Sequence, residues 1–241
     1  TEIYTLSLHD ALPIWLVCLG DMVGFTLPFY RYIETRNAAA CLRLVKENCS
    51  AVVAGNHDLY AVKKTPEYQA GFPYGDQWYA LDYDIRAQKA RNRIWLYEDS
   101  EIRCRLGDGD KEFLFGLKEM ERREWDGVKF MFSHFCYPDV SGSAIFFPSQ
   151  SFHLKKHLAF MAEHDCAISL SGHGHPEGAL VVNEYEFIQH GFKTVRLSKG
   201  PQWIVIPCVA RTSRKNGVMV FDTSERSIST ISFQTYDPKD Q

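Results

Sequence analysis

The sequence lacks any uninterrupted apolar run of the roughly 20 residues that a membrane-crossing helix needs. It also has little net charge, −3 at pH 7 with a pI near 6.3, and so lacks the broad basic field that holds nucleic acid. Its first residues have neither the basic start nor the long apolar core of a secretory signal. We therefore expect no membrane span, no stable nucleic-acid binding and a cytoplasmic location.

Disulfide-forming cysteine patterns are missing as well. The seven cysteines are odd in number, show no C-x-x-C spacing, and mostly lie in apolar runs such as WLVCL and WIVIPC. This usage is typical of buried free thiols in a reducing compartment. What the chain of 241 residues does have is apolar and aromatic content, 45% and 14%, which suits one large globular domain better than two.

Short apolar runs alternate with helical patterns along the chain. We predict strands at 15–21 and 51–58 around a helix at 37–48, and later strands at 128–134 and 167–175. A helix at 151–164, capped by Ser151, precedes the last of these strands. This alternation predicts an α/β fold with β-α-β units. The last third contains the runs QWIVIP, GVMVFDT and SISTISFQT and the turn signal Asn216-Gly217, and we predict that it forms the antiparallel part of a second sheet.

Polar, metal-competent side chains follow the predicted strands where each one ends. In open α/β sheets, ligands gather at the carboxyl ends of strands. Taken singly, each residue has a simple structural explanation: a Gly-Asp pair is most often a turn, as at 106–110, and His134 alone is more often a core histidine. Four strand ends that carry such residues together favour a metal site, with these candidates: Asp21, Asn56, His57, Asp58, His134, His173 and His175.

These residues occur in a recognisable order: Gly20-Asp21, then Gly55-Asn56-His57-Asp58, then His134, then Gly172-His173-Gly174-His175. The series resembles the calcineurin-like metallophosphoesterase superfamily over roughly residues 15 to 222. The resemblance implies a four-layer αββα sandwich that holds two divalent metal ions, and ligands of mixed N and O type suit Mn, Fe or Zn.

The resemblance also implies a role for each residue. The second metal ion would take Asn56, His134 and His173 together with Asp21, and His175 would go to the first. A carboxylate is the best bridge between two ions, which assigns that role to Asp21. Residues two apart on an extended segment point the same way, so both imidazoles of 172–175 could face the ions. We predict that His57 is the general acid for the leaving group and that Asp58 orients its imidazole.

One element of the family pattern has no counterpart. A D-x-H motif should end an earlier strand and supply two ligands to the first metal ion, but only residues 1–14 precede Trp15. His9-Asp10 has the reverse order and lies too close to Asp21 for a parallel crossover. Residues 4–14 match a translated sequencing adapter, so we expect 1–14 to be non-native and the domain, 15–241, to lack its first strand and helix. We then expect about one tightly bound metal ion per chain and impaired hydrolysis.

The substrate is less defined by sequence. An aromatic insert at about 59–100 could be a cap whose rings stack on a nucleobase, or it could pack on the scaffold: Tyr60, Tyr68, Phe72, Tyr74, Trp78, Tyr79 and Tyr83. Four arginines could clamp phosphate or lie on the surface: Arg31, Arg36, Arg211 and Arg214.

The predicted function is that of a metallophosphoesterase acting on a phosphomonoester or phosphodiester of a small molecule or nucleotide. The alternatives are a serine/threonine-type protein phosphatase and a catalytically impaired metal-binding protein. The oligomeric state stays open.

Overall fold

The computed structural model describes residues 15–27, 32–210 and 214–233. The segment 1–14, Arg31 and Arg211 lie outside the described residues. Among the helices of the described part, none combines the length and the apolar character that a bilayer crossing requires.

A six-stranded mixed sheet forms the centre of the fold, with its strands in the order β3-β4-β5-β9-β6-β7. Strands β4, β5 and β9 run parallel to one another, and β3, β6 and β7 are antiparallel to their neighbours. Their bounds are Met120–Trp125 (β3), Val128–Ser133 (β4), Ile168–Ser171 (β5), Ala179–Val182 (β6), Phe187–His190 (β7) and Gln202–Val205 (β9).

Two smaller sheets lie against one face of this sheet. One pairs β1 (Val17–Cys18) with β2 (Ala51–Val52) in parallel, and the other is antiparallel with the order β10-β11-β8. The bounds of the latter strands are Thr194–Arg196 (β8), Gly217–Asp222 (β10) and Ser227–Ser232 (β11). The core between the layers is apolar because strand side chains alternate, so that Phe130 and Phe132 of β4 point inward to Ile228 of β11.

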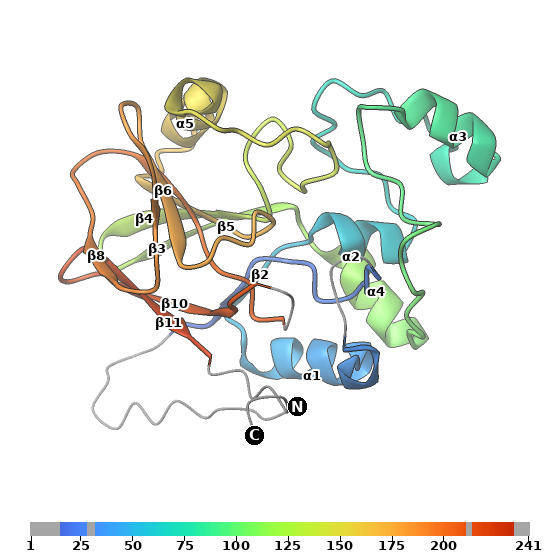
Figure 1. Ribbon diagram of the computed structural model, residues 1–241, viewed down its shortest axis with the longest axis horizontal. Coiled ribbons are helices and arrows are strands. Elements are labelled where there is room, and N and C mark those ends of the chain that lie inside the picture. Colours follow the sequence, from blue (N-terminus) through green and yellow to red (C-terminus); the bar gives the residue numbers. More distant parts are fainter. Residues whose placement is uncertain (1–14, 28–31, 211–213, 234–241) are drawn as a thin grey trace.

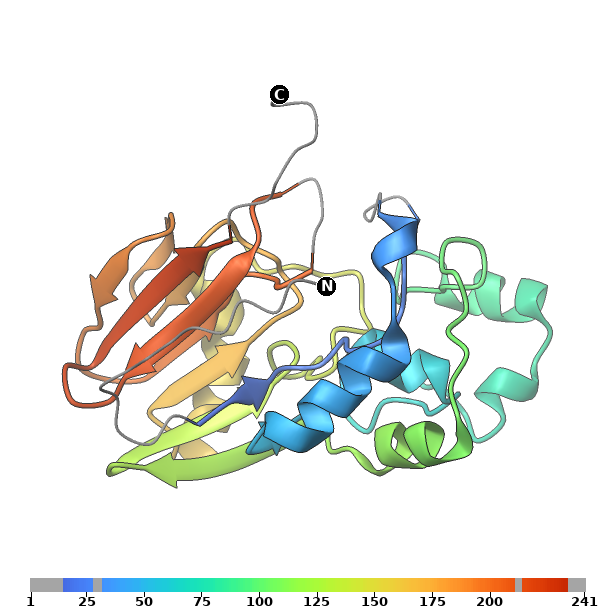
Figure 2. The same cartoon turned by 90° about the horizontal axis from the view of Figure 1, so that it is seen from below.

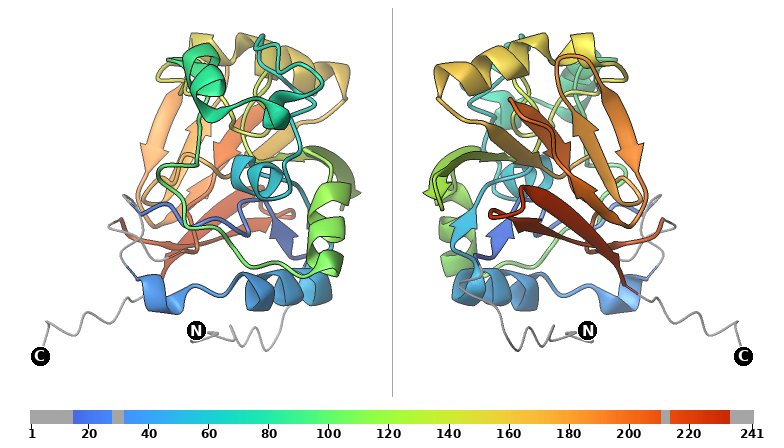
Figure 3. Two further views of the ribbon diagram at one scale, coloured as in Figure 1. Left: turned by 90° about the vertical axis from the view of Figure 1, so that its right-hand side faces the viewer. Right: turned by 90° about the vertical axis from the view of Figure 1, so that its left-hand side faces the viewer.

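Helices cover both outer faces. Helix α1 (Ala38–Asn48) packs Leu42 beneath β1 and β2, and its N-cap Asn37 accepts a hydrogen bond from the backbone of Ala40. Helix α5 (Lys155–Glu163) lies on the far side of the six-stranded sheet, where Met161 contacts the outward-facing Met131. Four layers therefore stack as α5, six-stranded sheet, small sheets and α1 (Figures 1 and 3). The αββα sandwich expected from the sequence is confirmed.

The remaining helices lie at one end of the sandwich, on the right of Figure 1. They are the α-helices α2 (Asn56–Ala61), α3 (Tyr83–Ala90) and α4 (Asp108–Gly116) and the 3₁₀ turns η1 (Ile33–Thr35) and η2 (Trp78–Ala80). The second Gly-Asp pair, at 107–108, begins α4 and is not the turn expected at 106–110. Figure 2, seen from below, shows α1 and the β10–β11 hairpin on the same side of the molecule.

Two further local predictions differ from the structure. Ser151 does not cap an α-helix, because residues Ser151–Leu154 form a 3₁₀ turn (η3) and α5 begins only at Lys155. The run QWIV belongs to the six-stranded sheet as β9, where all four residues are buried; a strand covered on both faces carries apolar residues at consecutive positions. Asn216-Gly217 lies between the runs QWIVIP and GVMVFDT and leads into β10, and the hairpin turn between β10 and β11 falls at 223–226.

Candidate metal centre

The predicted site residues come from four separate segments that meet at one end of the sheets. Asp21 follows β1, Asn56 begins α2 after β2, His134 follows β4 and His173 follows β5. Strands β4 and β5 are parallel neighbours, so the segments that leave their carboxyl ends start side by side.

Three of the predicted ligands converge in the structure. Asp21, His134 and His173 each offer one ligand atom, and these atoms all lie within 4.8 Å of one another. His134 Nε2 is 2.9 Å from Asp21 Oδ2 and 3.2 Å from His173 Nδ1. In the part of the chain that the structure describes, this is the one group of three or more such side chains placed to hold a metal ion.

The ring of His134 is held in the orientation that a metal ligand needs. Its Nδ1 lies 2.6 Å from the backbone carbonyl oxygen of Leu19, which can only accept, so Nδ1 donates. Nε2 faces Asp21 Oδ2 and His173 Nδ1; in the charged ring it donates to the carboxylate, and it would offer its lone pair to a metal ion once that proton is released. Metal-binding imidazoles usually donate their second N–H to a carbonyl or carboxylate in this way.

Two buried polar atoms beside the cluster lack a hydrogen-bond partner among the described residues: Asn56 Oδ1 and His173 Nε2. The amide of Asn56 is fixed from its other end, because its Nδ2 donates to the hydroxyl of Tyr97 at 2.6 Å. Buried oxygen and nitrogen atoms without partners are costly unless something binds them. A divalent cation would satisfy the amide oxygen, and one nitrogen of His173 would join it, so this donor set of one carboxylate, one amide oxygen and two imidazoles fits a borderline metal ion.

Close backbone contacts hold the β1 segment against the start of α2. Gly20 has a φ of +90°, and a Cβ there would lie 2.5 Å from the backbone N of Gly55, so only glycine allows this approach. The backbone N–H of His57 then donates to Asp21 Oδ1 at 3.0 Å. The metal-facing carboxylate is thus oriented by the helix that also carries Asn56.

Asp58 does not hold the ring of His57, contrary to the sequence prediction. Its fully buried carboxylate accepts four backbone N–H bonds, of 2.7 to 3.2 Å, from Asp21, Met22, Val23 and Gly55. It is at the third helical position of α2, where a carboxylate reaches back to the start of the helix. Asp58 therefore ties the β1 segment to α2.

His57 instead pairs with Glu101, a residue that sequence reasoning missed. His57 Nδ1 lies within hydrogen-bond distance of Glu101 Oε2, and the carboxylate is 2% exposed. Burial lowers the pKa of His57, but the charges of Asp21 and Glu101 outweigh it and raise the pKa to about 9. Neither Glu101 nor Tyr97 directly follows a predicted strand or belongs to a motif. The sequence therefore gives no indication that either residue belongs to the site.

The loop after β5 has a different shape from the extended one expected. His173 and His175 both have positive φ, of 55° and 45°, and Gly174 N–H turns back to the carbonyl of Gly172 at 2.6 Å. The two imidazoles therefore do not follow strand alternation. His175 lies outside the cluster of three, although the charges of Asp21 and His134 act on it.

The pKa values of the candidate ligands are shifted in different directions. Burial disfavours the charged form of Asp21, yet the neighbouring His134 and His57 outweigh it and hold its pKa below the usual value. Burial likewise opposes the charge of His134, and Asp21 raises its pKa. Burial and the charge of His134 hold the pKa of His173 well below its usual value, and burial lowers that of His175 to about 4. The last two are therefore neutral, as metal-binding imidazoles are.

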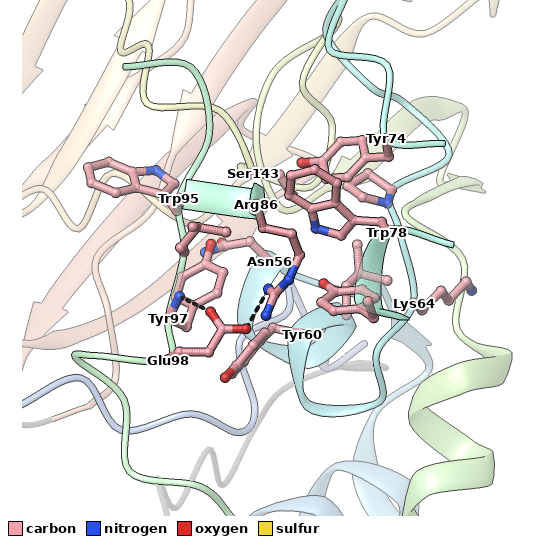
Figure 4. Close-up of a pocket in the computed structure, with 14 residues that line it drawn as sticks. Asn56, Tyr60, Lys64, Tyr74, Trp78, Arg86, Trp95, Tyr97, Glu98 and Ser143 are labelled. Carbon is pink, nitrogen blue, oxygen red and sulfur yellow. Dashed lines mark hydrogen bonds and ion pairs between the residues drawn. The ribbon is translucent and has the colours of Figure 1, made fainter. Parts of the chain in front are cut away.

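The aromatic insert packs on itself. Phe72, Tyr74 and Trp78 are each 5% exposed or less and contact one another edge to face. Figure 4 shows the interior of this region, where Arg86 pairs with Glu98 beside Tyr60 and Trp78. The cavity there has a volume of only about 20 Å³, room for one water molecule. The alternative that these rings form scaffold is therefore favoured over nucleobase stacking.

The two arginines inside the described ranges differ in position. Arg36 is exposed after η1. Arg214 reaches the loop of the candidate ligands and donates to the carbonyls of Gly174 and His175, at 3.4 and 3.2 Å.

Solved structures share this fold. A metallophosphoesterase from Sphaerobacter thermophilus matches with a TM-score of 0.59 over 90% of this chain and 76% of its own, at 14% identity. A hypothetical protein from Pyrococcus horikoshii matches with a TM-score of 0.53 over 92% and 75%, at 12% identity. No protein-family model matches the sequence, and no curated protein matches it significantly. The likeness shows the fold, which agrees with that implied by the calcineurin-like sequence pattern.

Proposed function

We propose that this chain, which has the fold of a metallophosphoesterase, is a metal-dependent hydrolase of phosphomonoesters or phosphodiesters of small molecules or nucleotides. The observation that carries the proposal is the convergence of Asp21, His134 and His173 within 4.8 Å, beside the unpartnered Oδ1 of Asn56. These four residues would hold a divalent cation, with Mn, Fe or Zn the best suited. The free cysteines fit a reducing compartment such as the cytoplasm.

The full proposal includes a second, more weakly held ion, which His175 and Asp21 would help to hold. Bound divalent cations supply charge neutralisation on the phosphoryl oxygens and an activated water. The catalytically impaired alternative is favoured by one observation: among the described residues, no further His, Cys, Asp or Glu side chain joins His175 and Asp21 in a second group of three.

The protein's own residues supply the remaining chemistry. When the phosphorus–oxygen ester bond breaks, the leaving oxygen needs a proton, and the imidazole of His57 would donate it. Glu101 accepts from His57 Nδ1, so that Nε2 is the atom left to face the substrate. His57 and the ligand Asn56 are consecutive residues at the start of α2, which keeps the acid next to the centre.

The test compares two Gly-Asp pairs of the chain. Asp21→Ala removes a proposed ligand, and Asp108→Ala removes the fully exposed aspartate of the second pair. Purified chain supplied with Mn is assayed for bound metal and for hydrolysis of 4-nitrophenyl phosphate, bis(4-nitrophenyl) phosphate and a phosphopeptide. We expect Asp21→Ala to lose tight metal binding and at least about 10²-fold in rate, and Asp108→Ala to keep both.

Each other outcome has a definite meaning. Metal binding and hydrolysis that survive Asp21→Ala would contradict the proposed centre. A faster rate on the phosphopeptide than on the small esters would favour the protein phosphatase. Metal binding without hydrolysis of any ester would identify the catalytically impaired alternative.

A further inference from the structure

A second, much larger pocket adjoins the candidate metal centre on the face of the six-stranded sheet that α5 covers. Its volume is about 460 Å³, within the range of about 300 to 1,000 Å³ that is usual for small-molecule sites. The buried side chains of Phe135, Trp203 and Val205 line its interior. We call it the ring pocket and define it by these residues with Phe147, Phe187 and Gln189.

The ring pocket touches the centre through aromatic contacts. The ring of Phe147 stacks on the imidazole of His173, with centroids 5.0 Å apart and planes within 4°. Phe135 contacts the same imidazole at 4.7 Å, and Gly174, the next residue in the chain, lines the pocket itself. A group bound in the pocket would thus contact Phe147 or Phe135, and each of these rings contacts the proposed metal ligand His173.

The wall formed by β6 and β7 presents polar as well as apolar groups. Leu180 and Gln189 are directly paired in the register, and Phe187 lies two residues from Gln189 on the same face. Glu177 and Arg214 complete the rim. The rim therefore presents the amide of Gln189, which can both donate and accept. The guanidinium of Arg214 already donates to the carbonyls of Gly174 and His175, and the carboxylate of Glu177 accepts from the backbone of Lys215, so these two groups add charge at the rim.

We infer that the ring pocket binds an aromatic or heteroaromatic ring on the ester group of the substrate, while the phosphoryl group lies at the metal centre. Stacking on Phe147 and Phe187 suits a planar ring, and the donors and acceptors of the rim suit the edge of a heterocycle such as a nucleobase. An alkyl chain would make no use of these polar groups. This inference rests on the proposed function and names its substrate class.

The test uses two ligands that share a ribose 5-phosphate group and differ only in the ring. Adenosine 5′-monophosphate and ribose 5-phosphate are titrated as inhibitors of bis(4-nitrophenyl) phosphate hydrolysis, and their binding to Mn-loaded chain is measured by calorimetry. We expect the nucleotide to bind at least about tenfold more tightly, since stacking on one aromatic side chain contributes that much.

Matched variants locate the effect. Phe147→Ala and Gln189→Ala should each reduce the tenfold preference to threefold or less, with bound metal unchanged. Phe146→Ala and Ile188→Ala replace adjacent side chains that are 57% and 41% exposed and lie outside the pocket, and they should keep the preference. Because Gln189 does not touch His173, it separates loss of the pocket from damage to the centre.

The two proposals fail in distinguishable ways. Hydrolysis of the reporter with equal affinity for both ligands, or with no binding of either, would overturn the ring pocket and leave the phosphoesterase standing. A preference for the nucleotide that survives both Phe147→Ala and Gln189→Ala would also overturn it. A preference that follows the variants without hydrolysis of any ester would support the pocket and contradict the catalytic function.

Discussion

Two buried carboxylates near the start of α2 have different hydrogen-bond partners and therefore different roles. Asp58 accepts four backbone N–H bonds and fixes the chain, and Glu101 pairs with the imidazole of His57. A carboxylate that is fully occupied by backbone donors cannot also orient a side chain. Glu101 is therefore a positioning residue for the proposed acid, and Asp58 supports the position of Asp21.

This division predicts the effect of Glu101→Gln. The amide cannot supply the charge that holds the His57 ring as a donor, so kcat on alkyl phosphoesters should fall by about 10 to 100-fold. KM and bound metal should stay near their original values, and the unfolding temperature should fall, because the buried imidazole of His57 loses its charged partner. Steady-state kinetics with metal analysis measure this, and Asp99→Asn, on an exposed carboxylate two residues away, is the control. An unchanged kcat would contradict the role.

A second residue-scale prediction concerns Gly24, which has a φ of +97°. A Cβ there would lie 2.8 Å from the Cβ and Nδ1 of His57, so Gly24→Ala should displace the ring and lower kcat at least about tenfold. Gly75→Ala is the matched control, because it also has positive φ but nothing within 4 Å of the added methyl group. Equal activity of the two variants would show that His57 tolerates the displacement.

At the scale of elements, α5 is held to the sheet by a buried histidine. His157 Nδ1 accepts the backbone N–H of Tyr137 at 2.9 Å, and its Nε2 lies 3.0 Å from the hydroxyl of Ser169 in β5. The ring is 1% exposed, and burial lowers its pKa from 6.5 to about 3. A proton on Nδ1 would break the bond to Tyr137, so the folded chain requires the neutral form.

The depressed pKa of His157 predicts acid sensitivity. Below pH 6.5 the unfolded chain takes up a proton that the folded chain refuses until about pH 3, so this contribution is complete above 6.5 and lost as the pH falls. The loss should approach about 1.4 kcal/mol per pH unit. His157→Gln should be less stable at pH 7.5 but lose less stability between pH 7.5 and 5.0, as urea unfolding would measure. Parallel losses in both proteins would contradict this account.

At the scale of the whole molecule, the candidate metal centre connects segments from two layers of the sandwich. The segments after β1, β2, β4 and β5 come from two different layers of the sandwich, and their side chains meet at Asp21, Asn56, His134 and His173. A cation that binds only when these segments are together stabilises the assembled state of the layers.

Metal loading should therefore raise the unfolding temperature. At about 100 times the dissociation constant, Mn would add about 2.7 kcal/mol, which is roughly 5 to 10 °C for a chain of this size. A thermal melt with Mn and with EDTA measures the shift, and Asp21→Ala should abolish it. We also expect about one tightly held ion per chain after dialysis. A full shift in Asp21→Ala would mean that metal binds elsewhere.

The sequence by itself determined the α/β class and the candidate site residues, because both depend on local pattern; the four layers and the ligand roles were what the resemblance implied. Apolar runs define strands, and the residues directly after a strand can only lie at its end, which is how Asp21, Asn56, His134 and His173 were found. Tertiary structure alone decided the partners of these residues. Glu101 is 44 residues from His57 in sequence, and the ring pocket combines Phe147, Gln189 and Trp203 from separate elements. Such contacts arise only when the segments pack together, so no local pattern encodes them.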